Sequence, residues 1–208
     1  THTYADPNHN ANWNALKVAA NGKPVWVTES ANLNSTDQSM TDAANYIKWI
    51  LRGFNEGGVT GYMFHLFYEE ADSDGYSSLV AWTPTGELIL PKRYHSFKHF
   101  TNLVKKGYSL INSNSSDENQ VYVGGFMSED ESKVIVQIFN EGNEKDLSID
   151  IPLGSSSLET FLSTNNDSEE FLSIGINEID YYNRYFTTTL PALSLTSLVF
   201  DIDESLSN

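Results

Sequence analysis

A change of pattern near residue 106 limits the fold of this chain more than any other feature. Before it, apolar stretches alternate between the period of a strand and that of a helix. After it, short strand-like runs follow one another and are separated by turns rich in Asn, Gly, Ser and Asp. The first pattern is typical of a parallel α/β sheet or barrel, and the second of an antiparallel β-sandwich. We therefore expect an α/β domain over residues 1–106 and an all-β domain over residues 107–208.

The expected elements follow from these periods. Apolar residues at helical spacing predict three helices, at residues 12–20, 40–54 and 92–105. Thr36 or Asp37 can cap the second helix, and Tyr94, Phe97, Phe100, Leu103 and Val104 are expected to face inward from the third. Runs of β-branched and aromatic residues predict strands at 1–4, 24–28, 59–67, 79–82, 121–123, 134–139, 147–151, 158–162 and 186–200.

The first domain has too few strands to stand as a closed barrel. Three or so parallel strands cannot close a barrel or cover both faces of an open sheet. The chain begins at Thr1, in what already resembles the end of a strand, without a methionine or a signal peptide. We expect that an N-terminal part, from the same protein or from another chain, completes this domain.

Composition narrows the partners. The chain has 28 acidic and 12 basic residues and a formal net charge of −16, which argues against nucleic acid or an anionic membrane surface and favours a neutral partner. No cysteine is present, so disulfides and thiolate metal sites are excluded. No apolar run is long enough to span a bilayer. We expect no cofactor and no metal, and we interpret the acidic stretch 69–74 as a solvated rim, with a hard cation held by its oxygens as the alternative.

Three Asn-X-Ser/Thr sequons lie in polar, loop-like sequence, at Asn34, Asn114 and Asn166. Such sites can carry an oligosaccharide in a secreted protein. We therefore expect a secreted or extracellular glycoprotein.

The candidate site lies where strands of the first domain end. The strand 24–28 is followed directly by Glu29, and the carboxyl ends of parallel strands are where chemistry is placed in α/β folds. Neighbouring strand ends carry His2 and Tyr4, and the aromatic run 64–68. A carboxylate beside a tyrosine hydroxyl, an imidazole and aromatic faces suits sugar chemistry. The alternative for each residue is structural: a solvated loop glutamate, a core aromatic, a structural histidine.

Several segments, in order along the chain, resemble one family. His2-Thr3-Tyr4 is similar to the end of its sixth barrel strand, Val25-Trp26-Val27-Thr28-Glu29 to its seventh, and residues 59–67 to its eighth. Residues 91–100 resemble the helix that leads into its second domain, and residues 186–199 its closing strand, built as T-L-P-A-x-S-x-T. The chain thus resembles the C-terminal half of a clan A glycoside hydrolase, most closely family 30, which joins a (β/α)8 barrel to a side β-sandwich.

The resemblance implies a retaining double displacement with Glu29 as the nucleophile. In the family the acid/base stands at the end of the fourth strand, which would precede Thr1, and no residue of this chain matches it. Glu69 and Glu70 lie near a strand end, but the family does not take its acid from the eighth strand. The residues expected to bind substrate are His2, Tyr4, Trp26, Phe64, His65 and Phe67.

Two departures from the family bear on the substrate. Many members carry tryptophan near the end of the eighth strand, where this chain has Phe64, His65 and Phe67. Glucuronoxylan-specific members use an arginine in the following loop, which is acidic here, so recognition of a uronic acid is disfavoured.

Three hypotheses result. The first is the C-terminal portion of a secreted retaining glycosidase that cleaves a neutral β-linked polysaccharide such as xylan or β-glucan, whose partners are that polysaccharide and the N-terminal part of the same protein. The second is a non-catalytic, glycosidase-derived module that binds carbohydrate or serves as a structural surface glycoprotein. The third is an unrelated α/β enzyme with an appended sandwich. Under the first, residues 1–208 alone are expected to be inactive.

Overall fold

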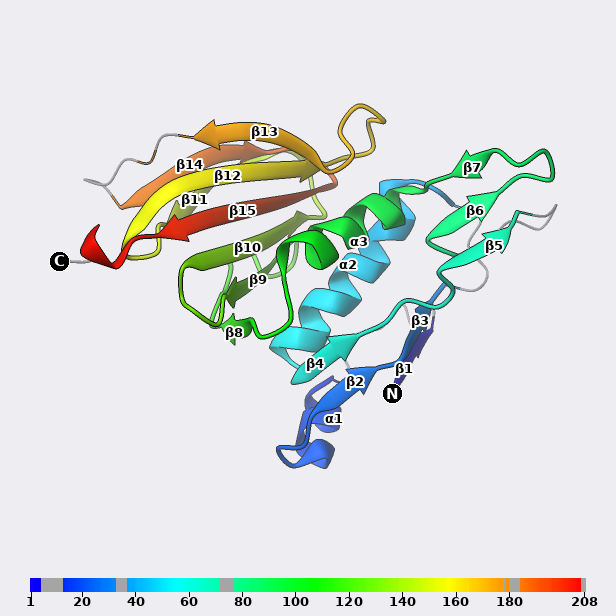
Figure 1. The fold of residues 1–208 in the computed structure, drawn as a ribbon, viewed down its shortest axis with the longest axis horizontal. Coiled ribbons are helices and arrows are strands. Elements are labelled where there is room, and N and C mark those ends of the chain that lie inside the picture. The colour runs from blue at the N-terminus through cyan, green and yellow to red at the C-terminus, as the bar shows by residue number, and fades with distance from the viewer. Residues whose placement is uncertain (5–12, 33–36, 72–76, 178, 180–183, 207–208) are drawn as a thin grey trace. The chain divides into compact units, whose positions relative to one another are not determined.

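The computed structural model describes residues 1–4, 13–32, 37–71, 77–177, 179 and 184–206 (Figure 1). It consists of two compact units, Thr1–His95 and Ser96–Asn208. The division between them lies within the third helix, whereas the sequence pattern placed it after that helix. The first unit mixes helices with parallel strands, and the second is built of antiparallel strands around a core of its own.

Parallel pairing organises the start of the first unit. Strand β1 (His2–Tyr4) pairs with β3 (Glu29–Ala31), and β2 (Val25–Val27) pairs with β4 (Val59–Tyr62). Beyond β4, the backbone N–H of Met63 donates to the carbonyl oxygen of Val27 at 2.8 Å, and that of His65 to Ser30 at 3.1 Å. The continuous segment β2–β3 therefore lies between β1 and β4, and the predicted parallel arrangement is confirmed.

The first two predicted helices are present as α1 (Trp13–Ala20) and α2 (Met40–Asn55). The apolar stripe of α2 is buried as predicted, but Asp42, Tyr46 and Trp49 are buried as well. The predicted cap was wrong for Asp37: Ser39 caps α2 by accepting from the N–H of Thr41 at 3.1 Å, because the helix begins at Met40. The other candidate, Thr36, lies outside the described residues.

The third helix, α3 (Lys92–Leu103), has a polar buried face, which corrects the prediction of an apolar one. Phe100 is buried, but Tyr94, Phe97, Leu103 and Val104 are only half-buried. Arg93, His95 and His99 are buried instead. Hydrogen bonds satisfy these buried polar groups. In the first unit, Arg93 Nε donates to the Ser78 carbonyl oxygen at 2.7 Å. Within the second unit, both ring nitrogens of His99 contact serine hydroxyls, those of Ser163 and Ser197.

A small sheet follows β4. Strand β5 (Tyr68–Glu70) pairs in parallel with β6 (Val80–Trp82), which pairs antiparallel with β7 (Leu88–Ile89) (Figure 1). Glu69 and Glu70 therefore belong to a strand and not to a loop; Glu70 is exposed to solvent, as expected of a rim, and Glu69 is half-buried. The Glu69 carboxylate accepts hydrogen bonds from the backbone N–H groups of Ser77 and Ser78, the second at 2.6 Å.

The second unit holds two antiparallel sheets. The larger sheet has the order β13-β12-β15-β10-β9-β8, and the smaller pairs β11 with β14 (Figure 1). The strands are β8 (Ser109–Ile111), β9 (Val121–Met127), β10 (Lys133–Asn140), β11 (Lys145–Asp150), β12 (Ser155–Ser163), β13 (Leu172–Asn177), β14 (Tyr185–Leu190) and β15 (Ser194–Ile202), followed by the 3₁₀ helix η1 (Glu204–Leu206). Side chains from both sheets form one apolar core, with Leu158, Leu198 and Phe200 from the larger sheet and Leu190 from the smaller.

The strand predicted over residues 186–200 is in fact two. The chain leaves β14 at Pro191 and enters β15 at Ser194, in the other sheet. Proline lacks the N–H that a continuous ladder needs, and Leu193 takes a positive φ of 46°, so the segment turns from one sheet to the other.

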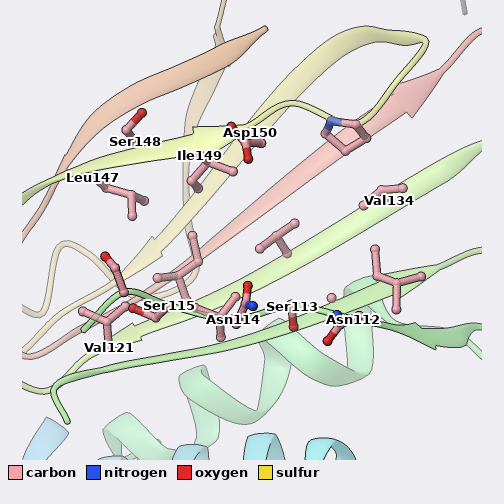
Figure 2. Close-up of a pocket in the computed structure, with 17 residues that line it drawn as sticks. Asn112, Ser113, Asn114, Ser115, Val121, Val134, Leu147, Ser148, Ile149 and Asp150 are labelled. Atoms are coloured by element: carbon pink, nitrogen blue, oxygen red, sulfur yellow. The ribbon is translucent and has the colours of Figure 1, made fainter. Parts of the chain in front are cut away.

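A cavity of about 360 Å³ lies in the second unit (Figure 2). Leu147 and Ile149 of β11 line it on one side, and Val121 and Val134 line it on the other. The polar segment 112–116, which contains the sequon residue Asn114, lines it as well. Asn114 is exposed, as is the sequon residue Asn166, whereas Asn34 lies outside the described residues.

Within the described part of the chain, no helix is long and apolar enough to cross a membrane. Among the same residues, no three His, Asp or Glu side chains are grouped so that they could hold a metal ion.

Candidate active site

Glu29 stands where the chain leaves β2 and enters β3. Thr28 belongs to neither strand, and its N–H donates to the carbonyl oxygen of Thr1 at 3.0 Å. Val25 and Val27 are buried, Trp26 is 53% exposed, and Glu29 is half-buried. Glu29 thus follows the carboxyl end of β2 after one intervening residue and is itself the first residue of β3, with its carboxylate partly accessible.

His2 is the side chain in direct contact with Glu29. The two residues are in register across β1 and β3, and His2 Nδ1 lies 3.4 Å from Glu29 Oε2. Their side chains are 48% and 36% exposed, respectively. A contact this open to water adds little to stability.

Tyr62 supports the strand next to Glu29. Its hydroxyl lies 2.6 Å from Ser30 Oγ and 3.4 Å from Thr3 Oγ1, so it bridges β1, β3 and β4. Burial raises the pKa of Tyr62 to about 12, and the hydrogen bonds from Ser30 and Thr3 lower it in part. The phenol is therefore neutral at ordinary pH. Tyr62 was not predicted as a site residue; its only signal in the sequence is its place in the strand predicted over residues 59–67.

Trp26 points away from the buried valines of its own strand. Its indole ring lies over Gly61 of the paired strand β4, where a Cβ atom would come within 3.2 Å of the ring. The glycine thus leaves room for a large aromatic side chain on β2, three residues before Glu29.

The remaining predicted substrate-binding residues are spread over different surroundings. The ring of Phe64 packs on the buried Tyr46 of α2, with centroids 4.7 Å apart. His65 is half-buried, and the peptide bond that follows it is cis. Phe67 is 63% exposed and lies beside Tyr68. Tyr4 of β1 pairs with Ala31 of β3, and the side chain of Tyr4 lies outside the described part of the structure. The structure thus brings His2 to Glu29, and it gives Phe64 a packing contact with a helix.

A buried polar network holds the segment after β3. Asn32 Nδ2 donates to Asp42 Oδ1 at 3.1 Å, and the Asn32 N–H donates to the hydroxyl of Tyr46 at 2.6 Å. Arg93 Nη1 donates to Asp42 Oδ2 at 3.0 Å and to the carbonyl oxygen of Asp37, also at 3.0 Å. Burial and the charge of Asp42 raise the pKa of Tyr46 above its usual range. The chain three residues beyond Glu29 is therefore fixed to α2 and α3, which the sequence analysis did not foresee.

The sequence of the chain was compared with family models and with curated proteins. No family model matches the chain. It is 24% identical over 206 residues to a glucuronoxylanase, XynC, of Bacillus subtilis, and 25% identical over 207 residues to the XynC of strain 168. Each match covers 96% of this chain and 44% of the relative.

Solved structures agree with this match. A GH30 endoxylanase from Clostridium papyrosolvens C71 superposes with a TM-score of 0.72 at 20% identity, over 96% of this chain and 47% of the enzyme. A family 30 subfamily 8 xylanase from Clostridium acetobutylicum gives 0.70 at 23% identity, over 88% of this chain and 44% of that one. The chain is a homologue of the family 30 glycoside hydrolases.

The wider likeness is one of fold. An arabinose-bound α-L-arabinofuranosidase, only 13% identical, gives a TM-score of 0.67 over 98% of this chain and 36% of that enzyme. The chain spans less than half the length of the curated relatives it matches, and this share is consistent with the C-terminal half that the sequence motifs indicate.

Proposed function

We propose that this chain is the C-terminal portion of a retaining glycoside hydrolase that cleaves a β-linked neutral polysaccharide of the xylan type, with Glu29 as the nucleophile. The observation that carries the proposal is the placement of Glu29: an accessible carboxylate at the carboxyl end of a parallel strand, in contact with His2, in a homologue of family 30 xylanases.

The proposed architecture extends the observed strand pairing. The segments β1, β2–β3 and β4 are the last three strands of a (β/α)8 barrel within residues 1–106, and residues 107–208 are the side β-sandwich. The likeness to family 30 structures over almost the whole chain supports this. The remaining strands and the acid/base belong to the N-terminal part of the same protein, which is the proposed partner of this chain.

The proposed chemistry proceeds in two displacements. A carboxylate oxygen of Glu29 bonds to the anomeric carbon while the bond to the leaving oxygen breaks, and a second carboxylic acid about 5 Å away protonates that oxygen. Water then gives a proton to this second carboxylate, attacks the same carbon and releases Glu29. His2 holds the attacking carboxylate, and Trp26 and Phe67 offer aromatic faces to the sugar.

The segment after β4 bears on the choice of xylan. The curated relatives are named glucuronoxylanases, and an acidic substituent is best bound by arginine. Here that segment carries Glu69 and Glu70. A carboxylate repels a uronic acid, so we favour a backbone with neutral substituents, and β-glucan is the second candidate.

We further propose that the protein is extracellular. Two sequon residues, Asn114 and Asn166, are exposed and can accept an oligosaccharide. Polysaccharides of the proposed class are too large to enter cells, which makes secretion the natural partner of this activity.

The decisive variant is Glu29→Gln in the full-length protein. Glutamine keeps the size of the side chain but is a far weaker nucleophile, so kcat on xylan should fall by at least about 10³-fold. Glu118→Gln, an exposed carboxylate in the second unit, is the matched control and should retain activity.

Reducing-sugar release measures both variants. Full activity in Glu29→Gln would refute the assignment of the nucleophile. A parent protein that binds xylan without cleaving it would instead favour the non-catalytic alternative.

A further inference from the structure

The small sheet β5–β6–β7 leaves one of its faces open to solvent. The register pairs Tyr68 with Val80, Glu70 with Trp82, and Trp82 with Leu88. Because successive residues of a strand alternate between faces, these five side chains share one face. Tyr68, Glu70 and Leu88 are exposed on it, and Val80 and Trp82 are half-buried.

The other face of this sheet is turned inward. It carries Glu69, Ala81 and Ile89, of which Ala81 is fully buried. The Glu69 carboxylate is occupied by the N–H groups of Ser77 and Ser78. The sheet is thus anchored on one side, and the orientation of its open face is fixed.

Aromatic rings dominate the open face. The rings of Tyr68 and Trp82 lie side by side, with centroids 5.4 Å apart and planes inclined by only 36°. Tyr68 is 62% exposed, although burying a tyrosine ring would stabilise the fold. Both rings lie on the same face of the sheet as the exposed carboxylate of Glu70. We call these three residues the aromatic platform.

This combination matches the chemistry of a neutral polysaccharide. The C–H faces of pyranose rings stack on aromatic rings, and the hydroxyls at their edges donate to carboxylates. An anionic partner is disfavoured both by Glu70 and by the net charge of −16. An apolar protein surface would leave Glu70 without a partner in the interface.

Backbone hydrogen bonds connect the aromatic platform to β3, the strand that begins at Glu29. The N–H of His65 donates to the carbonyl oxygen of Ser30, and the next two residues, Leu66 and Phe67, accept from the N–H groups of Leu79 and Val80 at 3.1 and 2.9 Å. One backbone segment therefore pairs first with the strand of the candidate nucleophile and then with the strand that carries Trp82.

We propose that the aromatic platform of Tyr68, Trp82 and Glu70 binds a neutral β-linked polysaccharide chain at a subsite beyond the one where the bond is cleaved. This inference rests on the proposed function, and it adds a second contact surface for the same polymer. Sugar rings stack on Tyr68 and Trp82, and a hydroxyl donates to Glu70. Loss of the platform weakens the binding of long chains more than that of short ones.

The test uses the full-length protein with Glu29→Gln, so that bound xylan is not consumed. Calorimetry gives the Kd for soluble arabinoxylan and for xylobiose as the short probe. We expect Tyr68→Ala and Trp82→Ala each to raise the Kd for arabinoxylan about three- to tenfold, and to change that for xylobiose less than twofold. Tyr68→Phe and Trp82→Phe keep a ring and should restore most of the affinity.

Tyr185→Ala is the matched control, since Tyr185 is an aromatic residue that is 45% exposed on β14 of the second unit. The Kd of this variant for arabinoxylan should equal that of the parent protein. Unchanged affinity for arabinoxylan in both alanine variants would overturn the proposal. So would a change of sedimentation coefficient with unchanged Kd, because it would assign the face to a second copy of the chain.

Two further outcomes remain informative. If Trp82→Ala does not fold, Tyr68→Ala alone decides, because its side chain is largely exposed. If the Glu29→Gln protein still hydrolyses xylan, the proposed nucleophile is wrong, whereas the comparison of Kd values still tests the platform.

Discussion

The chemistry of Glu29 depends on how its side chain leaves the strand. In an unbroken strand, residues 25, 27 and 29 would share one face, and that face is buried at Val25 and Val27. Thr28 interrupts the strand, so the alternation restarts at Glu29, and the carboxylate becomes half-exposed beside His2. Because Thr28 lies outside the two strands, the carboxylate of Glu29 is half-exposed instead of facing the buried side with Val25 and Val27.

Tyr62 permits a prediction about alkaline stability. Its pKa is about 12 in the folded protein and 10.0 in a reference state without burial. As pH rises from about 10 to 12, the unfolded chain loses this proton while the folded chain keeps it, so the free energy of unfolding should fall. Two pKa units correspond to about 2–3 kcal/mol.

Denaturant unfolding at a series of alkaline pH values, with Tyr62→Phe as the comparison, measures this loss. The stability of the variant should decline less steeply over the same interval, because phenylalanine has no proton to lose. Parallel curves for parent and variant would contradict the account of Tyr62.

At the scale of elements, Arg93 and Asp42 join α3 to α2 in the first unit. Both side chains are 1% exposed, and Arg93 also donates to carbonyl oxygens of Asp37 and Ser78. Removing one member of a buried pair leaves the other charge uncompensated. Arg93→Met should therefore cost about 3–5 kcal/mol of unfolding free energy, and Asp42→Asn in the same chain should recover part of it.

Arg52→Met is the control for that experiment. Arg52 forms an i,i+4 pair with Glu56 at 2.7 Å on the more accessible side of α2, so its loss should cost no more than about 1 kcal/mol. Thermal and urea unfolding compare the variants. If Arg52→Met and Arg93→Met lowered the free energy of unfolding equally, the buried pair would contribute no more to stability than the exposed one.

Much of the element order could be predicted from the sequence, because periodicity reports which residues lie on one face. The helices at 13–20 and 40–55 and the antiparallel strands after residue 107 follow from local pattern alone. The polar face of α3 could not, since burial of Arg93 and His99 depends on partners far away in the chain. The strands β7 and β8 were not predicted, because each is too short to show the alternation of apolar and polar residues that marks a strand.

Some residues of the candidate site could likewise be predicted from the sequence, and others could not. Glu29 and His2 were both predicted as site residues on neighbouring strands, and the parallel register of β1 and β3 places them opposite each other. Tyr62 and the network around Asp42 were missed, since their roles come from contacts that span tens of residues. Phe64 was predicted to bind substrate because it is aromatic. Its packing on the ring of Tyr46, a residue 18 positions earlier, could not be predicted from the sequence.

At the scale of the whole molecule, the proposed active site and the proposed barrel both require residues beyond this chain. The chain covers 44% of the length of its curated relatives, and none of its residues matches the acid/base of the family pattern. We therefore expect residues 1–208 alone to release no sugar from xylan, and the full-length protein to do so.

Covalent trapping identifies the residue that attacks the sugar. The full-length protein is incubated with a mechanism-based 2-fluoro-xylobioside, which forms the glycosyl-enzyme but breaks it down slowly, and the labelled peptide is mapped by mass spectrometry. The account predicts one sugar per protein, attached to the carboxylate of Glu29. A label on any other residue, or continued turnover without a label, would contradict it.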